Sequence, residues 1–287
     1  MCDDFTEHAA SARLSRRAFA GAGTAALVAG CAPGSDVGGS GTAELAERPV
    51  AIETGEGVAD GFFVAPARGR HPGVILWPDI GGLRDVYKVM ARRLAGEGYA
   101  VLAVNQYWRS APAPVLTSFA EWRTPEGKAK LEPMIARVTP AAIVTDAKAF
   151  VAFLDKEPSV DKRKGIGTQG YCMGGPFTVR TAAASPGRVR AAASFHGAAM
   201  VTDAPDSPHR LLSATRASYL VAIARNDDTR APTDKDTLKA AAEAAKRPAE
   251  IEVYAADHGW CVADSPVYDR AEAERAWGRL LAHYAKL

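Results

Sequence analysis

The sequence has little excess charge of either sign. Its 287 residues include 35 Lys and Arg against 33 Asp and Glu, which leaves a formal net charge of +2. Domains that bind nucleic acid usually concentrate basic residues on one surface. The short basic run at residues 162–164 is instead typical of solvated surface beside a strand. We therefore expect no nucleic-acid partner, and a small molecule as the substrate.

Cysteine is also scarce. The four cysteines, Cys2, Cys31, Cys172 and Cys261, form no CxxC or Cys/His spacing of the kind that holds a metal. We expect no metal and no organic cofactor. A Cys172–Cys261 disulfide is one alternative outside the cytoplasm, and it would block chemistry at Cys172.

The N-terminal apolar stretch, residues 18–29, is too short to cross a bilayer as a permanent helix. It follows residues 13–19, RLSRRAF, which resemble a twin-arginine export signal. Residues 28–31, VAGC, resemble a bacterial lipobox, in which Cys31 would carry the lipid. An unprocessed, disordered N-terminus is the alternative.

These patterns predict three segments. Residues 1–30 are the predicted export signal, and residues 31–45, rich in Gly and Ser, are a predicted flexible tether. Residues 46–287 are the predicted folded domain. The mature protein is thus expected in the periplasm or cell envelope, with a lipid anchor on Cys31.

The predicted domain alternates strand-like and helix-like segments. The chain is 47% hydrophobic and 24% charged, as is typical of soluble globular proteins. Most strand candidates are short continuous apolar runs, and the segments between them are amphipathic. This alternation predicts an α/β fold with a mainly parallel central sheet covered by helices on both faces. The predicted strands are 62–65, 73–77, 99–104, 164–168, 191–195, 219–223 and 251–254.

The most informative motif is Gly-Tyr-Cys-Met-Gly-Gly at residues 170–175. G-x-S-x-G between a strand and a helix is the nucleophile elbow of α/β-hydrolases, and here Cys172 stands in the serine position. The glycines let neighbouring backbone approach a strained turn, and the N-terminus of the following helix favours a thiolate. We predict that Cys172 is a nucleophile. The alternative is a buried structural cysteine in a Gly-rich turn.

A thiol nucleophile needs a base and an acid that orients the base, in the chain order nucleophile, acid, histidine. His258 follows the last predicted strand and is the predicted base, whereas we expect His196 to be a satisfied core imidazole. Asp227 and Asp228 both follow the strand at 219–223. We choose Asp227, which lies closer to that strand, and Asp228 remains the alternative.

Two loops are predicted to complete the site. The loop at residues 78–85 contains two glycines, and we assign the N–H groups of Ile80 and Met173 as the oxyanion donors. The long connection at 105–140 carries several aromatic residues and has helical character near 127–137. Such insertions usually line or cover a pocket. Alternatively, these aromatics only pack the insertion onto the body of the domain.

These motifs resemble those of the dienelactone hydrolase family of α/β-hydrolases. The resemblance extends from about residue 61 to the C-terminus and implies hydrolysis of enol lactones through an acyl-thioester enzyme. The implied triad is Cys172, Asp227 or Asp228, and His258. The matching segments are 77–82, 105–109, 170–175, the loop with the two aspartates, and 257–259.

The resemblance also implies residues that contact the substrate. The family has a glutamate that holds the resting thiol neutral where this chain has Asp79, one methylene shorter. Arg109 matches an arginine that helps to bind a substrate carboxylate, and a second such arginine is replaced by Val262. We assign Asp79, Arg109 and Trp260 to substrate contact.

The prediction is therefore an exported, monomeric hydrolase of esters or lactones. Three alternatives remain open. They are a general carboxylesterase or thioesterase, a non-catalytic ligand-binding lipoprotein on the same scaffold, and a redox sensor that uses the Cys172–Cys261 pair.

Overall fold

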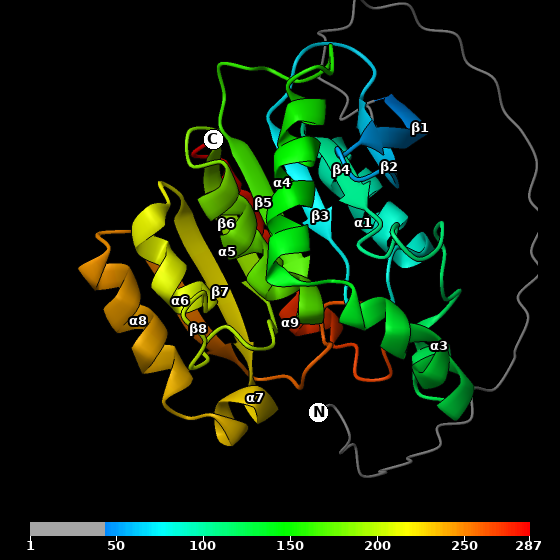
Figure 1. Ribbon diagram of the computed structural model, residues 1–287. Coiled ribbons are helices and arrows are strands. Elements are labelled where there is room, and N and C mark those ends of the chain that lie inside the picture. The colour runs from blue at the N-terminus through cyan, green and yellow to red at the C-terminus, as the bar shows by residue number, and fades with distance from the viewer. Residues whose placement is uncertain (1–43) are drawn as a thin grey trace, which may run out of the picture. The chain divides into compact units, whose positions relative to one another are not determined.

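The computed structural model describes residues 44–287 (Figure 1). The predicted export signal, and all but the last two residues of the predicted tether, lie outside the described residues. Within residues 44–287, no helix is both long enough and apolar enough to cross a membrane.

An eight-stranded sheet forms the centre of the domain, in the order β1-β2-β4-β3-β5-β6-β7-β8. The strands from β3 onward pair in parallel, whereas β1 with β2 and β2 with β4 are antiparallel. The strands are β1 Leu45–Glu53, β2 Val58–Pro66, β3 Gly73–Trp77, β4 Ala100–Val104, β5 Ile166–Tyr171, β6 Val189–Phe195, β7 Ser218–Ala224 and β8 Ala249–Tyr254.

Helices cover both faces because strand residues alternate between two apolar cores. On β3, Ile75 and Trp77 belong to the core that also contains residues of α4, α5 and α8, whereas Val74 and Leu76 belong to the core under α1 and α9. Figure 1 shows α4 and α5 crossing in front of the sheet. The helices are α1 Asp85–Gly96, α2 Phe119–Trp122, α3 Pro125–Ala136, α4 Pro140–Leu154, α5 Gly175–Ala184, α6 Pro208–Leu211, α7 Arg225–Arg230, α8 Asp234–Ala244 and α9 Arg270–Tyr284. The predicted mainly parallel sheet with helices on both faces is confirmed.

β1 is not among the predicted strands, and β5 lies two to three residues later than the predicted strand at 164–168. β1 is mostly exposed, and Ile52 is its only buried residue. It forms because its backbone pairs with β2 over nine residues, which a hydrophobic pattern cannot reveal.

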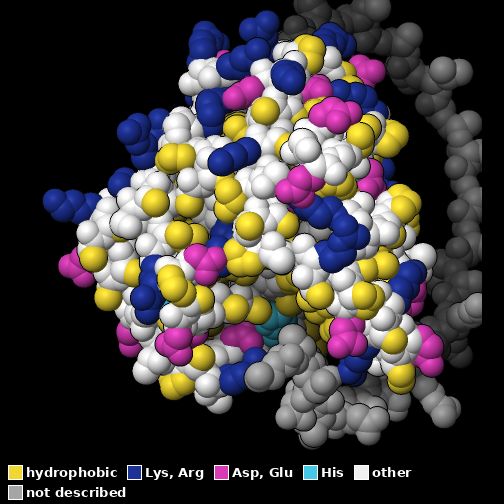
Figure 2. Space-filling model, viewed as in Figure 1, with side chains coloured by type: hydrophobic (Ala, Val, Ile, Leu, Met, Phe, Trp, Pro, Cys, Tyr) yellow, Lys and Arg dark blue, Asp and Glu magenta, His cyan; other side chains and the backbone are white. Residues whose placement is uncertain are grey.

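The carboxyl ends of the parallel strands meet at one edge of the sheet, where ligands usually bind in open α/β folds. The loops after β3, β5, β6, β7 and β8 all begin there. On the face shown in Figure 2, acidic side chains lie among basic ones, and a histidine side chain is visible at the margin of a hollow above α7.

Candidate active site

The nucleophile elbow lies at the end of β5. The chain turns through a 3-10 helix at Cys172–Gly174 into α5, and Cys172 has a φ of 50°. A Cβ on Gly170 would lie 2.0 Å from the Gly174 carbonyl oxygen, and one on Gly174 would lie 2.5 Å from the Pro78 carbonyl oxygen. Only glycine fits at these two positions. The left-handed backbone conformation of Cys172 costs a non-glycine residue about 1–3 kcal/mol, and strain of this kind is typical of functional sites.

His258 and Asp227 meet at the same edge. The His258 imidazole donates from Nδ1 to Asp227 Oδ2 at 2.6 Å. Asp227 lies on α7, a short helix where the sequence predicted a loop. Its neighbour Asp228 accepts instead from Lys235 Nζ at 2.8 and 3.0 Å. Successive side chains on a helix point in different directions, so only one of the two acids faces the imidazole.

The surroundings of His258 favour its charged form. Burial lowers the pKa of the imidazole, but attraction to a Cys172 thiolate and the hydrogen bond to Asp227 outweigh burial and raise the pKa well above its ordinary value. The Nε2 atom is buried and pairs with no nitrogen or oxygen atom of the described chain, and interaction with the Cys172 thiol contributes to the raised pKa of the ring. One nitrogen is thus fixed by the acid, and the other remains for proton exchange with a thiol or a substrate.

A second histidine holds the backbone of the nucleophile. His196 is 1% exposed, and its Nδ1 accepts from the Cys172 N–H at 3.1 Å. Burial and repulsion from His258 lower the pKa of His196 well below its ordinary value, which keeps the accepting ring neutral. Its Nε2 has no partner among residues 44–287, and its ring lies 4.8 Å from that of His258. The sequence placed His196 in the core but did not reveal its contact with the nucleophile.

The first predicted oxyanion donor, the Ile80 N–H, is oriented through its own peptide group. The carbonyl of that peptide belongs to Asp79 and accepts from Gln106 Nε2 at 2.6 Å. Because the C=O and N–H of a trans peptide point in opposite directions, this bond also fixes the direction of the Ile80 N–H. The next carbonyl, that of Ile80, accepts from the Tyr107 hydroxyl at 2.8 Å. No sequence pattern indicates this role of Gln106, because the bond is made to backbone.

The second predicted donor, the Met173 N–H, is held in a similar way. The carbonyl of its peptide belongs to Cys172 and accepts from the Ala198 N–H at 3.1 Å. Met173 lies in the first turn of the 3-10 helix, where N–H groups have no acceptor within the helix. Fixed backbone donors of this kind are what an oxyanion site requires.

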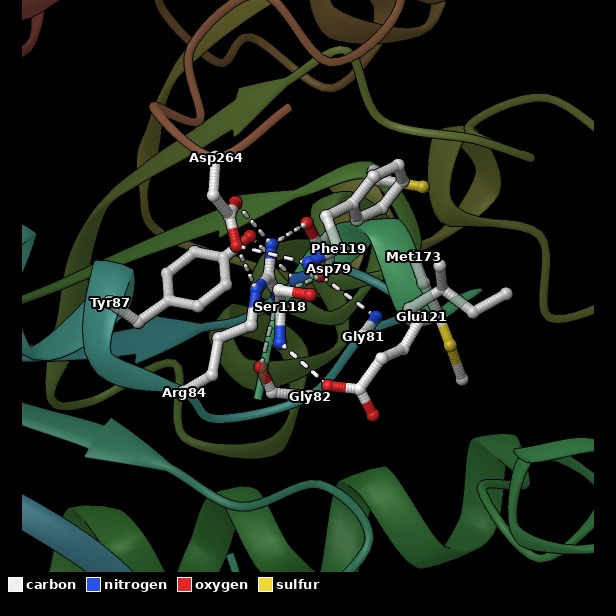
Figure 3. Close-up of polar contacts among 12 residues, drawn as sticks. Asp79, Gly81, Gly82, Arg84, Tyr87, Ser118, Phe119, Glu121, Met173 and Asp264 are labelled. Atoms are coloured by element: carbon white, nitrogen blue, oxygen red, sulfur yellow. Dashed lines mark hydrogen bonds and ion pairs between the residues drawn. The ribbon is translucent and has the colours of Figure 1, made fainter. Parts of the chain in front are cut away.

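Asp79 belongs to a buried ionic cluster (Figure 3). Arg84, which is 1% exposed, donates to Asp79 Oδ1 at 2.6 Å and Oδ2 at 2.9 Å, and to Asp264 at 2.7 and 2.8 Å. Asp79 Oδ1 also accepts from the Gly81 N–H at 2.8 Å. Both carboxylate oxygens are thus engaged within the fold, where they shape the loop that carries Ile80. Substrate contact by Asp79 stays a prediction.

Two other residues expected to contact substrate are engaged within the fold. Arg109 donates to Asp146 at 2.7 and 2.9 Å and to Glu56 at 2.8 Å, so its guanidinium is already paired with carboxylates. Burial raises the pKa of Asp146, and the bonds to Arg109 oppose that shift. Trp260 is fully buried and stacks on Tyr254 with ring centroids 5.2 Å apart. Substrate contact by Arg109 and Trp260 therefore stays a prediction, beside these contacts within the fold.

The two cysteines of the described domain are free thiols. Cys172 is buried and Cys261 is half-buried, and they are not joined as the disulfide alternative required. Burial raises the pKa of the Cys261 thiol well above its ordinary value, which keeps that thiol neutral. Over residues 44–287, no group of three or more His, Cys, Asp or Glu side chains could hold a metal ion.

Comparison with known proteins shows which family the chain resembles. A model of the dienelactone hydrolase family matches residues 59–286. A Synechocystis protein named "Putative carboxymethylenebutenolidase" is 30% identical over 225 residues, which cover 77% of this chain and 88% of that protein. A carboxymethylenebutenolidase from Pseudomonas sp. is 28% identical over 130 residues, covering 41% and 47%.

Solved structures share the fold. The crystal structure of a "Putative Dienelactone Hydrolase" from Klebsiella pneumoniae has a TM-score of 0.73 at 23% identity, covering 85% of this chain and 100% of that one. The dienelactone hydrolase-like promiscuous phosphotriesterase P91, from metagenomic libraries, has a TM-score of 0.67 at 21% identity, covering 85% and 98%.

Proposed function

This chain belongs to the dienelactone hydrolase family, and we propose that it hydrolyses an ester or a lactone with Cys172 as the nucleophile. The observation that supports this most directly is the strained Cys172 on its elbow, beside an imidazole whose pKa is raised by that cysteine and by Asp227. A purely structural cysteine needs neither a strained backbone nor an acid-oriented base.

The proposed reaction has two halves. The Cys172 thiolate attacks the carbonyl carbon, and the Ile80 and Met173 N–H groups donate to the resulting oxyanion. The carbon–oxygen bond to the alcohol then breaks, and the His258 imidazolium protonates the departing oxygen. In the second half, His258 takes a proton from water while the oxygen of that water attacks the thioester. The carbon–sulfur bond breaks, the acid leaves, and the thiolate–imidazolium pair is restored. Asp227 accepts from Nδ1 throughout.

The test is hydrolysis of p-nitrophenyl acetate by the purified protein, with and without prior iodoacetamide. We expect turnover that is lost on alkylation and in Cys172→Ala. Cys261→Ala is the matched control, because it removes the other thiol of the domain and should retain turnover. Full turnover by folded Cys172→Ala would reject the nucleophile assignment. Folded protein with a free thiol and no turnover would favour the non-catalytic ligand-binding alternative.

A broader carboxylesterase or thioesterase would use the same groups. Comparing kcat/KM for a lactone, a p-nitrophenyl ester and an acyl thioester of equal chain length separates these activities. We expect the oxygen esters and lactones to be preferred, and a higher kcat/KM for the thioester would assign a thioesterase.

We also propose that the protein is exported and acts as a monomer. The support for export is the sequence of residues 1–30 and the lipobox-like residues ending at Cys31. Replacing Arg16 and Arg17 by Lys should leave the protein in the cytoplasmic fraction, and Cys31→Ser should abolish labelling with a fatty-acid probe. Unchanged fractionation and labelling would reject both assignments. Size-exclusion chromatography with light scattering tests the monomer.

A further inference from the structure

The Arg84 cluster, formed by Arg84, Asp79 and Asp264, lies close to the proposed site and contains two carboxylates for one cation. One guanidinium pairs with both Asp79 and Asp264. The cluster lies between two loops of that site, since Asp79 precedes Ile80 and Asp264 lies on the segment that follows His258. Figure 3 shows the Arg84 guanidinium with its hydrogen bonds to Asp79 and Asp264. The formal charge of this cluster is one negative unit.

The Arg109 cluster repeats this excess. Its guanidinium pairs with Asp146, whose side chain is fully buried, and with Glu56, whose side chain is 51% exposed. The segment that carries Arg109 also supplies Gln106 and Tyr107, which hold the Ile80 peptide. Both arginines are therefore engaged, and each is outnumbered by its carboxylates.

The side of the site next to the nucleophile is apolar. Met173, which follows Cys172, packs against an apolar cluster of the 105–140 segment, and the Tyr107 hydroxyl lies 3.5 Å from its sulfur. The buried members of this cluster are Tyr107, Val115, Leu116 and Leu131. An acyl group held beside Cys172 would therefore meet hydrocarbon, and the Lys130 ammonium of the same segment is engaged with the Val115 carbonyl at 2.6 Å.

We infer that the site takes an ester or lactone whose acyl part is uncharged, and that it discriminates against one with a free carboxylate. This rests on the proposed function. A carboxylate would lose its hydration against the apolar wall, and would lie near two clusters that each carry an excess negative charge. Pairing the carboxylate with Arg84 or Arg109 would require breaking an ion pair already formed in the fold, which is strongly unfavourable for a buried pair.

The test compares two esters that differ in one charge: mono-p-nitrophenyl adipate, which has a free carboxylate, and its methyl ester. Both release p-nitrophenolate, and the spontaneous rate is subtracted from each. We expect kcat/KM for the methyl ester to exceed that for the acid by at least about tenfold, because placing like charges side by side is unfavourable. The ratio of the two kcat/KM values, methyl ester over acid, should fall when NaCl is added, because salt screens the charges.

Two variants test whether charge is the cause. Asp264→Asn and Glu56→Gln each remove one of the excess carboxylates, and each should narrow the ratio. Asp85→Asn is the matched control, because it removes a carboxylate that is 89% exposed and paired with Lys88 on α1, and it should leave the ratio unchanged.

The outcomes separate the inference from the function on which it rests. Equal or better turnover of the acid would overturn the inference alone. A preference for the methyl ester that neither variant narrows would overturn its electrostatic cause. Turnover of p-nitrophenyl acetate with neither adipate ester hydrolysed would overturn the inference alone, and failure with all three esters would reject the proposed hydrolase and the inference with it.

Discussion

Two ionic clusters at the same edge of the sheet differ in what they can do. In one, Arg84 uses its guanidinium to bind two carboxylates and is almost completely buried. In the other, His258 binds Asp227 through one nitrogen, and its second nitrogen pairs with no nitrogen or oxygen atom of the described domain. An arginine never loses its proton in a protein, whereas an imidazole does so near neutral pH. A group at a strand end can therefore take part in proton transfer only if it titrates and keeps one position free.

The largest test of this contrast compares the two adjacent acids of α7. Asp227→Asn should lower kcat by about 10⁴, because an amide cannot hold the imidazole in its tautomer and stabilise the imidazolium. Asp228→Asn should change kcat by less than about threefold, because it removes only a partly exposed pair with Lys235. Steady-state hydrolysis of p-nitrophenyl acetate measures both. Similar small effects of the two variants would show that neither acid orients His258.

The second test concerns the cluster that cannot titrate. Arg84→Met should lower the free energy of unfolding by about 3–5 kcal/mol, because Asp79 would be left buried without its cation. Urea denaturation measures the loss. Arg163→Met is the control, since it removes an arginine that is 89% exposed and should leave the midpoint almost unchanged. A wild-type midpoint for Arg84→Met would show that the cluster does not stabilise these loops.

The elements that the sequence predicted correctly are those whose signal is local. Strands such as β3 and β4 are short apolar runs buried on both faces, so their positions follow from hydrophobicity. The elbow is also local, because the glycines that allow its close contacts stand beside Cys172. The loop after the last strand indicates His258 as the base, and the structure brings this histidine to Asp227.

The features that the sequence did not reveal depend on distant partners. Arg84 and Asp264 are 180 residues apart, and no local pattern indicates that they pair. Gln106 and His196 act on backbone groups, whose orientation no residue type encodes. A family position predicts substrate contact for Asp79, whereas its pairing with Arg84 depends on the course of the following loop.

A third test addresses one of these unpredicted residues. Gln106→Leu should lower kcat by about 10- to 100-fold with little change in KM, because the Ile80 N–H would no longer be held in the direction that an oxyanion needs. The rate of alkylation by iodoacetamide serves as the internal control. That reaction needs the thiolate but forms no oxyanion, so its rate should stay within about twofold of wild type. An equal fall in both rates would mean that Gln106 acts on the fold of the site rather than on the donor.

The smallest expected effect separates the two neighbouring imidazoles. His196→Asn keeps an acceptor for the Cys172 N–H, and Asn tolerates the φ of 41° at this position, so activity should change by less than about threefold. His196→Ala removes the acceptor and leaves a buried N–H unpaired, which costs about 1–3 kcal/mol. Activity and stability retained equally by both variants would show that the hydrogen bond to the nucleophile has no role.

The pH dependence of His196→Asn follows from the same contrast. The folded protein holds the pKa of His196 well below its ordinary value, so below about pH 6.5 the unfolded chain binds a proton that the folded one excludes. Each such histidine lowers the free energy of unfolding by about 1.4 kcal/mol per pH unit on acidification. Burial lowers the pKa of His283 to about 4, so this histidine also lowers the free energy of unfolding as the pH falls below about 6.5.

His258 has the opposite effect on stability. Its contribution to the free energy of unfolding is complete below about pH 6.5 and is lost as the pH rises through its raised pKa. Urea denaturation between pH 5 and 8, where histidine titrates, measures the free energy of unfolding as a function of pH. In His196→Asn we expect the slope of this free energy below about pH 6.5 to fall by about the contribution of one proton, and the slope at higher pH to stay unchanged. A change in slope confined to the higher pH range would mean that His196, rather than His258, is the imidazole with the raised pKa.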